Sequence, residues 1–237
     1  MEFDSKKYFN KALTKIVLNQ LKEFGFKKFK TSHIARIENK EILQLINFQK
    51  SQYGDDSFTV NISVRPLYIK QEDIILEPGG RLGKFETGKD TWWRTDTEKE
   101  TDKSFQEITK IIIDKVLPWF DKNNSSQKII EYQQSLTAKK SILNFNRKKK
   151  SHTPIWKPDD FGFVALKQGE YNLAKQNFET TINQLKDKQE ISWCKKKTND
   201  FKNIIELIDK DNLDDISALL ETNMIGTINN LKLSKIQ

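Results

Sequence analysis

Apolar and polar positions alternate along residues 58 to 65, which predicts a β-strand with one apolar and one polar face. The residues from 43 onward have the composition of a preceding strand, and YGDDS at 53 to 57 predicts the turn between the two. The second strand should end at Pro66, which has no amide hydrogen to donate. Its apolar face carries Phe58, Val60, Ile62 and Val64, and its polar face carries Thr59, Asn61, Ser63 and Arg65.

Two stretches with apolar residues at three-to-four spacing flank these strands and predict amphipathic helices. The first spans residues 5 to 24, and Gly25 is placed to end it. The second starts at about Asp102, and Pro118 should kink or end it. The apolar faces of both helices need a sheet to cover. The pattern therefore predicts an α+β fold, with an antiparallel sheet of about four to six strands packed against the two helices.

The region between the strands and the second helix predicts mostly irregular structure. A strand is expected near Tyr68 and Ile69, a glycine turn in EPGGRLG, and a short strand around TWWRT. After the second helix, DKNNSSQ at 121 to 127 has the composition of a linker, and the helix after it should reach about Leu143.

The remainder of the chain predicts only helices. We expect them at about residues 160 to 168, 171 to 186, 199 to 209 and 213 to 231, with Asp200 and Asp211 as caps of the last two. These patterns divide the chain into three parts. They are an α+β domain at 1–122, a helix and basic linker at 123–157, and an α-helical region at 158–237.

The net charge of +8 is concentrated in one segment of the 237-residue chain. Residues 123 to 157 contain eight basic residues and one acidic residue. No apolar run approaches the roughly 20 residues that span a bilayer, and the N-terminus lacks the apolar stretch of a signal peptide. The single cysteine, Cys194, excludes an intrachain disulfide. We therefore expect a cytoplasmic protein without a membrane partner.

Several motifs follow one another in the N-terminal half: a helix ending in Gly25-Phe26, a strand ending in Phe48-Gln49, a strand with Phe58 and Asn61, then Arg81 and the pair Trp92-Trp93. The same motifs occur in this order in the bacterial family catalogued as domain of unknown function 4304. Residues from about 10 to 120 resemble that family. The resemblance implies an α+β domain and implies no activity.

A weaker resemblance lies in FGFVALKQGEYNLAKQNFETTI, within residues 158 to 186. The small, turn and aromatic positions of a tetratricopeptide repeat are matched by Gly162, Gly169, Tyr171, Ala174 and Phe178. The segment departs from that motif at Ala165, Thr181 and Lys186, and no second copy follows at its 34-residue period. The resemblance implies a helical hairpin that turns at Gly169.

The sequence gives little support for a catalytic or metal-binding motif. PGGRLGKF fails the phosphate-loop pattern, because Pro78 and Phe85 occupy two of its required positions. The two histidines, His33 and His152, have no ligand-type spacing, and Cys194 is interpreted as a buried filler. The adjacent acidic pairs fit turns and helix starts better than a catalytic dyad. No catalytic residue, metal or cofactor is therefore expected.

The favoured function is binding of a protein partner, through the open face of the sheet or the helical hairpin. If extended, Trp92 and Trp93 must point to opposite faces, so one of them should be buried and the other exposed near Arg94. An ordinary solvated sheet face explains the same polar row. The candidate binding residues are Gln49, Thr59, Asn61, Arg65, Arg81, Trp92, Trp93 and Arg94.

Two other functions stay open. The basic segment 139–157 could bind nucleic acid, with cations on phosphates and Trp156 stacked on a base. The cations concerned are Arg147, Lys148, Lys149 and Lys150. An enzyme with an unrecognised arrangement of carboxylates and arginine is the second alternative, and it would need a deep pocket that holds acids with shifted pKa values.

Overall fold

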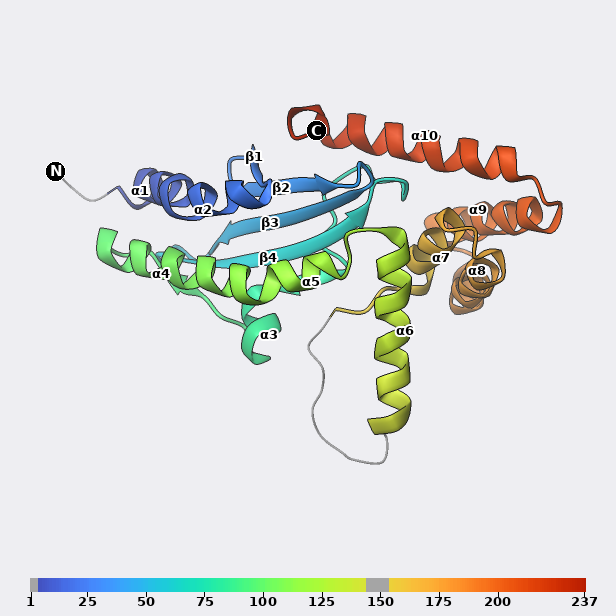
Figure 1. Cartoon of the computed structure of the whole chain (residues 1–237), viewed down its shortest axis with the longest axis horizontal. Helices are drawn as coiled ribbons and strands as arrows, with labels where there is room; N and C mark the ends of the chain where they lie inside the picture. Colours follow the sequence, from blue (N-terminus) through green and yellow to red (C-terminus); the bar gives the residue numbers. More distant parts are fainter. Residues whose placement is uncertain (1–3, 144–153) are drawn as a thin grey trace.

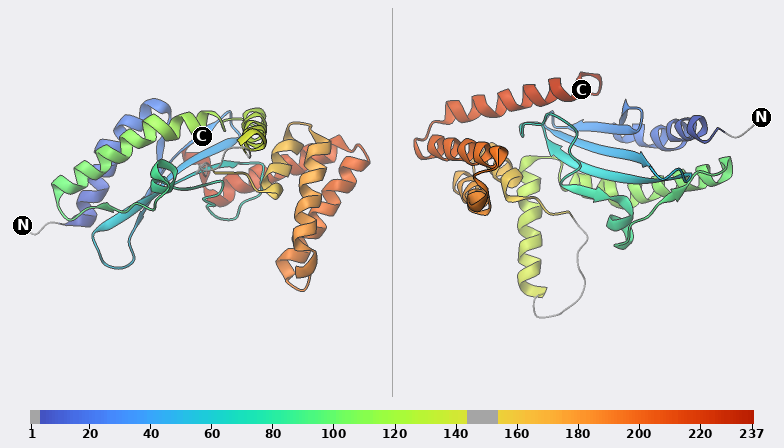
Figure 2. Two further views of the ribbon diagram at one scale, coloured as in Figure 1. Left: turned by 90° about the horizontal axis from the view of Figure 1, so that it is seen from below. Right: turned by 180° about the vertical axis from the view of Figure 1, so that it is seen from behind.

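The computed structural model describes residues 4–143 and 154–237, and the side chains of residues 4–136 and 154–237. Figure 1 shows a sheet with helices along one face, a group of helices beyond one end of the sheet, and α10 running back toward it. In Figure 2, the N-terminal helix and α4 lie side by side on the sheet. The predicted α+β class is therefore confirmed.

The sheet is antiparallel throughout, with strand order β1-β2-β3-β4-β5 and with β6 also paired to β4. A turn of three residues separates β2 from β3, and a turn of six residues separates β3 from β4 where YGDDS predicts it. Strand β4 ends at Pro66, as predicted. Positive φ angles at Asn39 and Lys40 make the first turn, and Gly54 adopts one in the second. The strands are β1 (Lys27–Lys30), β2 (His33–Glu38), β3 (Ile42–Lys50), β4 (Ser57–Pro66), β5 (Gly79–Arg81) and β6 (Trp93–Arg94).

The first predicted helix is present over residues 5 to 24. It consists of α1 (Ser5–Ala12), a π-helical stretch (Leu13–Leu18), α2 (Asn19–Leu21) and a final 3₁₀ turn. The helix ends at Gly25, which has a φ of 82°. Glycine adopts this left-handed conformation without a steric penalty.

The second helix differs from the prediction at both ends. It begins at α4 (Glu98–Ile111) rather than at residue 102, because the side chain of Thr97 caps it. Pro118 does not end it. A π-helical stretch (Ile112–Val116) precedes α5 (Leu117–Asp121), so that the proline lies in the first turn of α5. The π-helical stretch just before the proline changes the backbone hydrogen-bond pattern, and the helix continues past Pro118 to Asp121.

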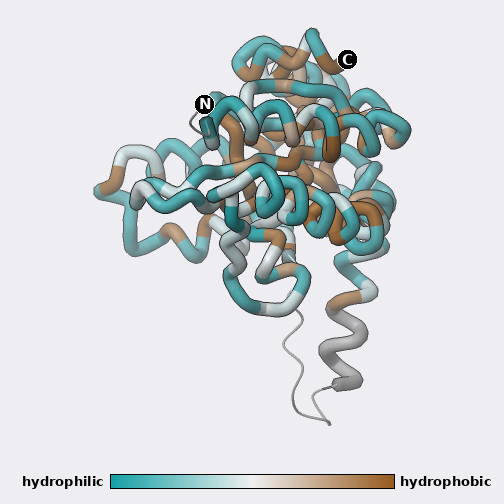
Figure 3. The backbone as a smooth tube through the Cα atoms, turned by 90° about the vertical axis from the view of Figure 1, so that its left-hand side faces the viewer, coloured by the Kyte–Doolittle hydropathy of each residue, from teal (hydrophilic) through white to brown (hydrophobic). Residues whose placement is uncertain are grey.

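Aromatic rings pack between the sheet and two helical rods, of which the first spans residues 5 to 24 and the second spans residues 98 to 121. The ring of Phe58 on β4 lies with its centroid 5.0 Å from that of Phe9 on α1 and 5.1 Å from that of Phe105 on α4. Residues of β4 with even numbers from 58 to 64 all face this core and are fully buried. Figure 3 shows apolar positions gathered inside the molecule and polar positions outside. Burial of these large side chains is the main stabilising contribution of the domain.

Two predictions for residues 67 to 81 are wrong. Tyr68 and Ile69 lie in a buried turn rather than a strand. Gly79 and Gly80 belong to strand β5, followed by α3 (Leu82–Thr87), rather than to a turn. A Cβ atom at Gly79 would lie 2.0 Å from the carbonyl oxygen of Ile62. The glycine is therefore needed because the two backbones approach closely.

The C-terminal part is helical, as predicted. It contains α7 (Pro158–Lys167), α8 (Tyr171–Leu185), α9 (Ser192–Asp209) and α10 (Leu213–Leu231), after α6 (Ser126–Leu143). The predicted caps are wrong: Asp200 lies inside α9, and the side chain that caps α10 is Asn212. Helix α9 begins eight residues before Asp200, at Ser192, and no side chain caps it.

Helices α7 and α8 form the hairpin that the repeat-like motif implies. The chain turns at Gly169, which has a φ of 78°. A Cβ atom at Gly162 would lie 2.6 Å from the ring of Phe178, so the missing side chain lets the two helices pack closely. The hairpin is observed, while a relation to tetratricopeptide repeats stays an expectation.

The hydrophobic core does not stop at the predicted boundary after residue 122. Ile129 and Ile130 of α6, together with Trp156, belong to the same buried cluster as the sheet and its helices. On the opposite face of the sheet, Leu43 and Leu45 pack against the end of α10 and the residues that follow it. The division into three domains stays a prediction, and the parts share packed surfaces.

Candidate functional site

The polar row of β4 is covered, which corrects the expectation of an open sheet face. Thr59, Asn61 and Arg65 are only 0%, 5% and 4% exposed. Ser63 donates a hydrogen bond to the carbonyl oxygen of Ile75 at 3.0 Å, so the segment after β4 folds back over the row. Alternation along one strand reveals which side chains share a face. What covers that face depends on distant parts of the chain.

Arg65 ties the sheet to the helical region. Its Nη1 donates to the carbonyl oxygen of Glu77 at 3.0 Å, and its guanidinium holds both carboxylate oxygens of Asp160. The Nη2–Oδ1 distance of that pair is 3.0 Å. Asp160 lies in the first turn of α7, where a carboxylate also interacts favourably with the helix dipole. The predicted binding residue Arg65 is thus engaged within the chain.

A second ion pair stands beside the first. Lys197 of α9 donates to Asp159, the neighbour of Asp160 on α7. Burial acts to raise the pKa of Asp159, but the hydrogen bond and positive charge of Lys197 outweigh it and hold the pKa below its usual range. The carboxylate is therefore ionised near neutral pH and is not a proton donor. Lys157 and Glu77 form a third pair at the same junction.

A cavity of about 690 Å³ opens where these ion pairs join the sheet to the helices. Apolar side chains of α7 and α9, including Phe163, Phe201 and Ile204, form much of its wall. Its charged lining consists of five basic and five acidic residues. The cavity is the pocket that an enzyme would need. Its carboxylates at 159 and 160, however, are both engaged with cations.

The other end of the same sheet face carries three side-chain amides and one imidazole, which we together call the amide cluster. Its members are His33, Asn47, Gln49 and Asn61. The Nδ2 of Asn61 donates to the Oδ1 of Asn47 at 3.0 Å and to the Oε1 of Gln49 at 3.1 Å. The Nδ2 of Asn47 donates in turn to the Nε2 of His33 at 2.8 Å. Three adjacent strands therefore hold one continuous hydrogen-bond chain.

His33 is neutral in this arrangement. Burial, with a smaller effect of the nearby Lys30 charge, lowers its pKa from 6.5 to about 4. An unprotonated Nε2 can accept from Asn47, and the Nδ1 lies 3.3 Å from the hydroxyl of Ser32. The amide cluster accordingly carries no net charge at neutral pH.

Arg81 and Trp92 extend this surface. Arg81 pairs directly with Asn61 in the β4–β5 register, so the two side chains share a face. The guanidinium carbon of Arg81 lies 4.9 Å from the ring centroid of Trp92, and its Nη1 lies 3.1 Å from Asp90. Trp92 retains 37% of its surface in solvent.

The tryptophan pair divides as predicted, with Trp92 exposed and Trp93 buried. The indole of Trp93 packs in the core and donates to Glu107 at 3.2 Å. Trp92 stacks on Arg81, and Arg94 pairs with Asp96 on the surface, while the expected proximity of Trp92 to Arg94 stays a prediction. Trp93, being buried, is unavailable to a partner.

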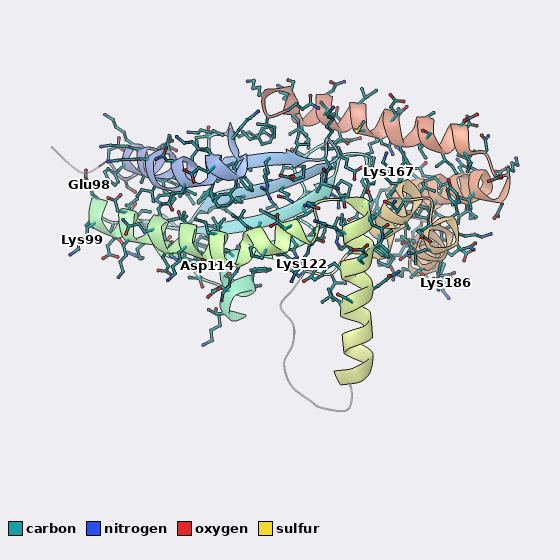
Figure 4. All side chains as sticks on the ribbon, in the orientation of Figure 1. Glu98, Lys99, Asp114, Lys122, Lys167 and Lys186 are labelled. Carbon is teal, nitrogen blue, oxygen red and sulfur yellow. The ribbon has the colours of Figure 1, made fainter. Side chains whose placement is uncertain are left out.

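The aromatic residue proposed for nucleic-acid binding is not available to a base. Trp156 is buried, and its indole donates to Asn123 at 3.2 Å, so its ring is not free to stack on a base. Arg147 and Lys148, Lys149 and Lys150 lie outside the described residues. Figure 4 shows acidic and basic side chains interspersed along the helices, with Glu98 and Lys99 adjacent on α4.

Sequence reasoning missed the partners of the predicted residues. Asn47 follows Leu45 by two positions and so belongs to the face opposite the helices, which was a usable signal. His33 and Asp160 reach their partners only through the fold. Within residues 4–136 and 154–237, no group of three or more His, Cys, Asp or Glu could hold a metal ion, and Cys194 is buried.

No helix among the described residues combines the length and apolarity needed to cross a bilayer. Neither a curated protein nor a solved structure matches the chain. Residues 17–122 match the family described as domain of unknown function (DUF4304). The motifs that suggest this family, from Gly25 to Trp93, all fall within the matched range. The matched residues contain the whole sheet and helices α4 and α5, and this part of the chain is similar to the DUF4304 family.

Proposed function

We propose that the chain is a non-catalytic protein-binding module, and that its partner docks on the half-buried members of the amide cluster, His33 and Gln49, and on the adjoining Arg81–Trp92 pair. The observation that carries this proposal is the bridging amide of Asn61, which fixes Asn47 and Gln49 beside an exposed indole. Such an arrangement is ordered before any partner arrives, and preorganised groups lose little conformational entropy on binding.

The chemistry of this surface suits a peptide backbone. A side-chain amide offers one acceptor and two donors, which match the groups of a peptide unit. No hydrogen bond engages the Nε2 of Gln49 or the Oδ1 of Asn61 within the described chain. Trp92 supplies the large amphipathic side chain that is typical of binding hot spots.

A protein fits this surface better than a polyanion does. The pKa of His33 is depressed to about 4, so the ring is uncharged, and Asp90 offsets the charge of Arg81. A phosphate backbone would instead favour several unpaired cations. The buried position of Trp156 removes further support for nucleic acid.

The test is capture of partners from the native cell with three forms of the tagged chain: wild type, Trp92→Ala and Phe24→Ala. Phe24 is the matched control, because it is 39% exposed and lies on the helical side of the sheet. We expect one protein to be retained by wild type and Phe24→Ala, after nuclease treatment, and lost with Trp92→Ala. Equal capture by all three forms would contradict the proposal, as would a product that nuclease removes.

A further inference from the structure

The cavity at the junction of sheet and helices is lined by a side-chain amide that has no hydrogen-bond partner among the described residues. Asn223 of α10 is only 9% exposed, and its side chain forms no hydrogen bond with the described residues. It lines the 690 Å³ cavity and also a neighbouring one of about 520 Å³. The amide is therefore free to donate to or accept from a ligand, in place of the solvent that can still reach it.

From this residue and its surroundings we propose that the junction cavity binds a neutral peptide segment of a partner protein. One large apolar side chain of the segment fills the cavity, and its backbone amide pairs with Asn223. The proposal shares with the proposed function only the class of partner. It concerns a different surface, on the far side of the Arg65–Asp160 ion pair from the amide cluster.

The walls of the cavity define the apolar anchor. Phe163 of α7 and Phe201 of α9 meet edge to face, with ring centroids 6.2 Å apart, and Ile204 lies one turn along from Phe201. Ile69 and Leu219 add aliphatic surface from the sheet side and from α10. The volume falls within the range of roughly 300–1,000 Å³ that is usual for ligand sites. It exceeds what a methyl group would fill, so the anchor is of leucine to tryptophan size.

The charges of the lining explain why the occupant is neutral. Five basic and five acidic side chains balance one another. The most buried of them, Arg65 and Asp160, are paired with one another, and Asp159 is paired with Lys197. The lining residues without an ion pair among the described residues are also balanced, with Lys70 and Lys196 against Glu72 and Asp200. A charged ligand of either sign would therefore meet as much repulsion as attraction and would still pay desolvation. An amide instead finds Asn223, which can donate and accept at once.

Binding can be measured on the full chain by saturation-transfer NMR with N-acetyl-phenylalaninamide as the probe. N-acetyl-alaninamide tests the need for the apolar anchor, and N-acetyl-phenylalanine, a carboxylate, tests the need for neutrality. We expect transfer to the phenylalaninamide only. Transfer of equal strength to all three probes, or none to the phenylalaninamide, would overturn the proposal.

Three variants locate the site. Asn203→Trp adds bulk at an exposed position on the rim of the cavity, and Lys202→Trp adds it one residue away, outside the lining. Asn223→Leu removes the amide without opening a cavity, so the variant should fold. We expect Asn203→Trp to abolish transfer, Lys202→Trp to retain it, and Asn223→Leu to weaken binding about tenfold, the factor for one hydrogen bond of ordinary strength.

Two results would assign a different occupant and reject the peptide. If benzyl alcohol binds as well as the phenylalaninamide, and equally in Asn223→Leu, the cavity takes small apolar molecules. If wild type self-associates in sedimentation and Asn203→Trp does not, the cavity is an interface between copies of the chain. Since none of these measurements involves Trp92, a negative result here leaves the capture experiment with Trp92→Ala unaffected.

Discussion

Arg65 of β4 and Asp160 of α7 form a buried bidentate ion pair between the sheet and the helical hairpin, although they lie 95 positions apart in sequence. Their side chains are 5% and 14% exposed. A charge buried at such a place is tolerated only while its counter-ion is present. The pair therefore acts as a structural link, and it explains why part of the polar row of β4 is unavailable to a partner.

Removal of the acid alone should destabilise the protein strongly. We expect Asp160→Ala to lower the free energy of unfolding by about 3 kcal/mol, because the Arg65 charge is left buried without its counter-ion. Asp96→Ala breaks the exposed Arg94–Asp96 pair and should cost less than about 1 kcal/mol. Urea unfolding curves of the two variants measure the difference. Equal costs would show that the Arg65 pair contributes no more than a surface contact.

Two glycines predict opposite effects of the same substitution. Gly162→Ala places a Cβ atom 2.6 Å from the ring of Phe178 and should destabilise the hairpin by about 1–3 kcal/mol. Gly226→Ala, inside α10, meets no atom within 4 Å. It should stabilise the protein by roughly 0.5–1 kcal/mol, because alanine is the better helix former. Thermal unfolding of both variants tests the helix packing, and a shift of the same sign in both would contradict it.

His33 predicts a pH dependence of stability. Above its unfolded pKa of 6.5 the residue is neutral in both states and contributes no slope. Between pH 6.5 and about 4 the unfolded chain takes up a proton that the folded chain refuses, so stability falls as the pH is lowered through this window. We expect the loss to be about 1 kcal/mol, since water reaches part of the ring and reduces the effect.

The variant that isolates this effect is His33→Gln, whose side-chain oxygen can still accept from Asn47. Urea unfolding at pH 7 and at pH 4.5 should show a smaller difference for the variant than for wild type. An unchanged difference would assign the pH dependence to other groups, such as Asp159, whose pKa the contact with Lys197 lowers.

Local pattern was sufficient for most of the fold. Spacing and glycine placement predicted the first helix to its end at Gly25, and alternation identified which residues of β4 face the core. The pattern could not predict which distant parts of the chain bury the polar face of β4. Thr59 and Arg65 were assigned to a solvated face, because nothing near them in sequence reveals the segment and helix that bury them.

The candidate site shows the same limit. Gln49, Asn61, Arg81 and Trp92 were selected by sequence and do lie on one surface. Their ordering depends on Asn47, whose significance appears only when β3 and β4 are placed in register. Asn223 was not selected, since an asparagine within a helix becomes notable only when its burial and lack of a partner are seen.

Photo-crosslinking in the native cell can show whether a protein partner docks on the surface around Trp92. A benzophenone amino acid replaces Trp92 in one form of the chain and the equally exposed Phe24 in another. We expect one discrete, nuclease-resistant protein adduct from position 92 and none from position 24. The same adducts from both positions, or no adduct from position 92, would contradict the proposal.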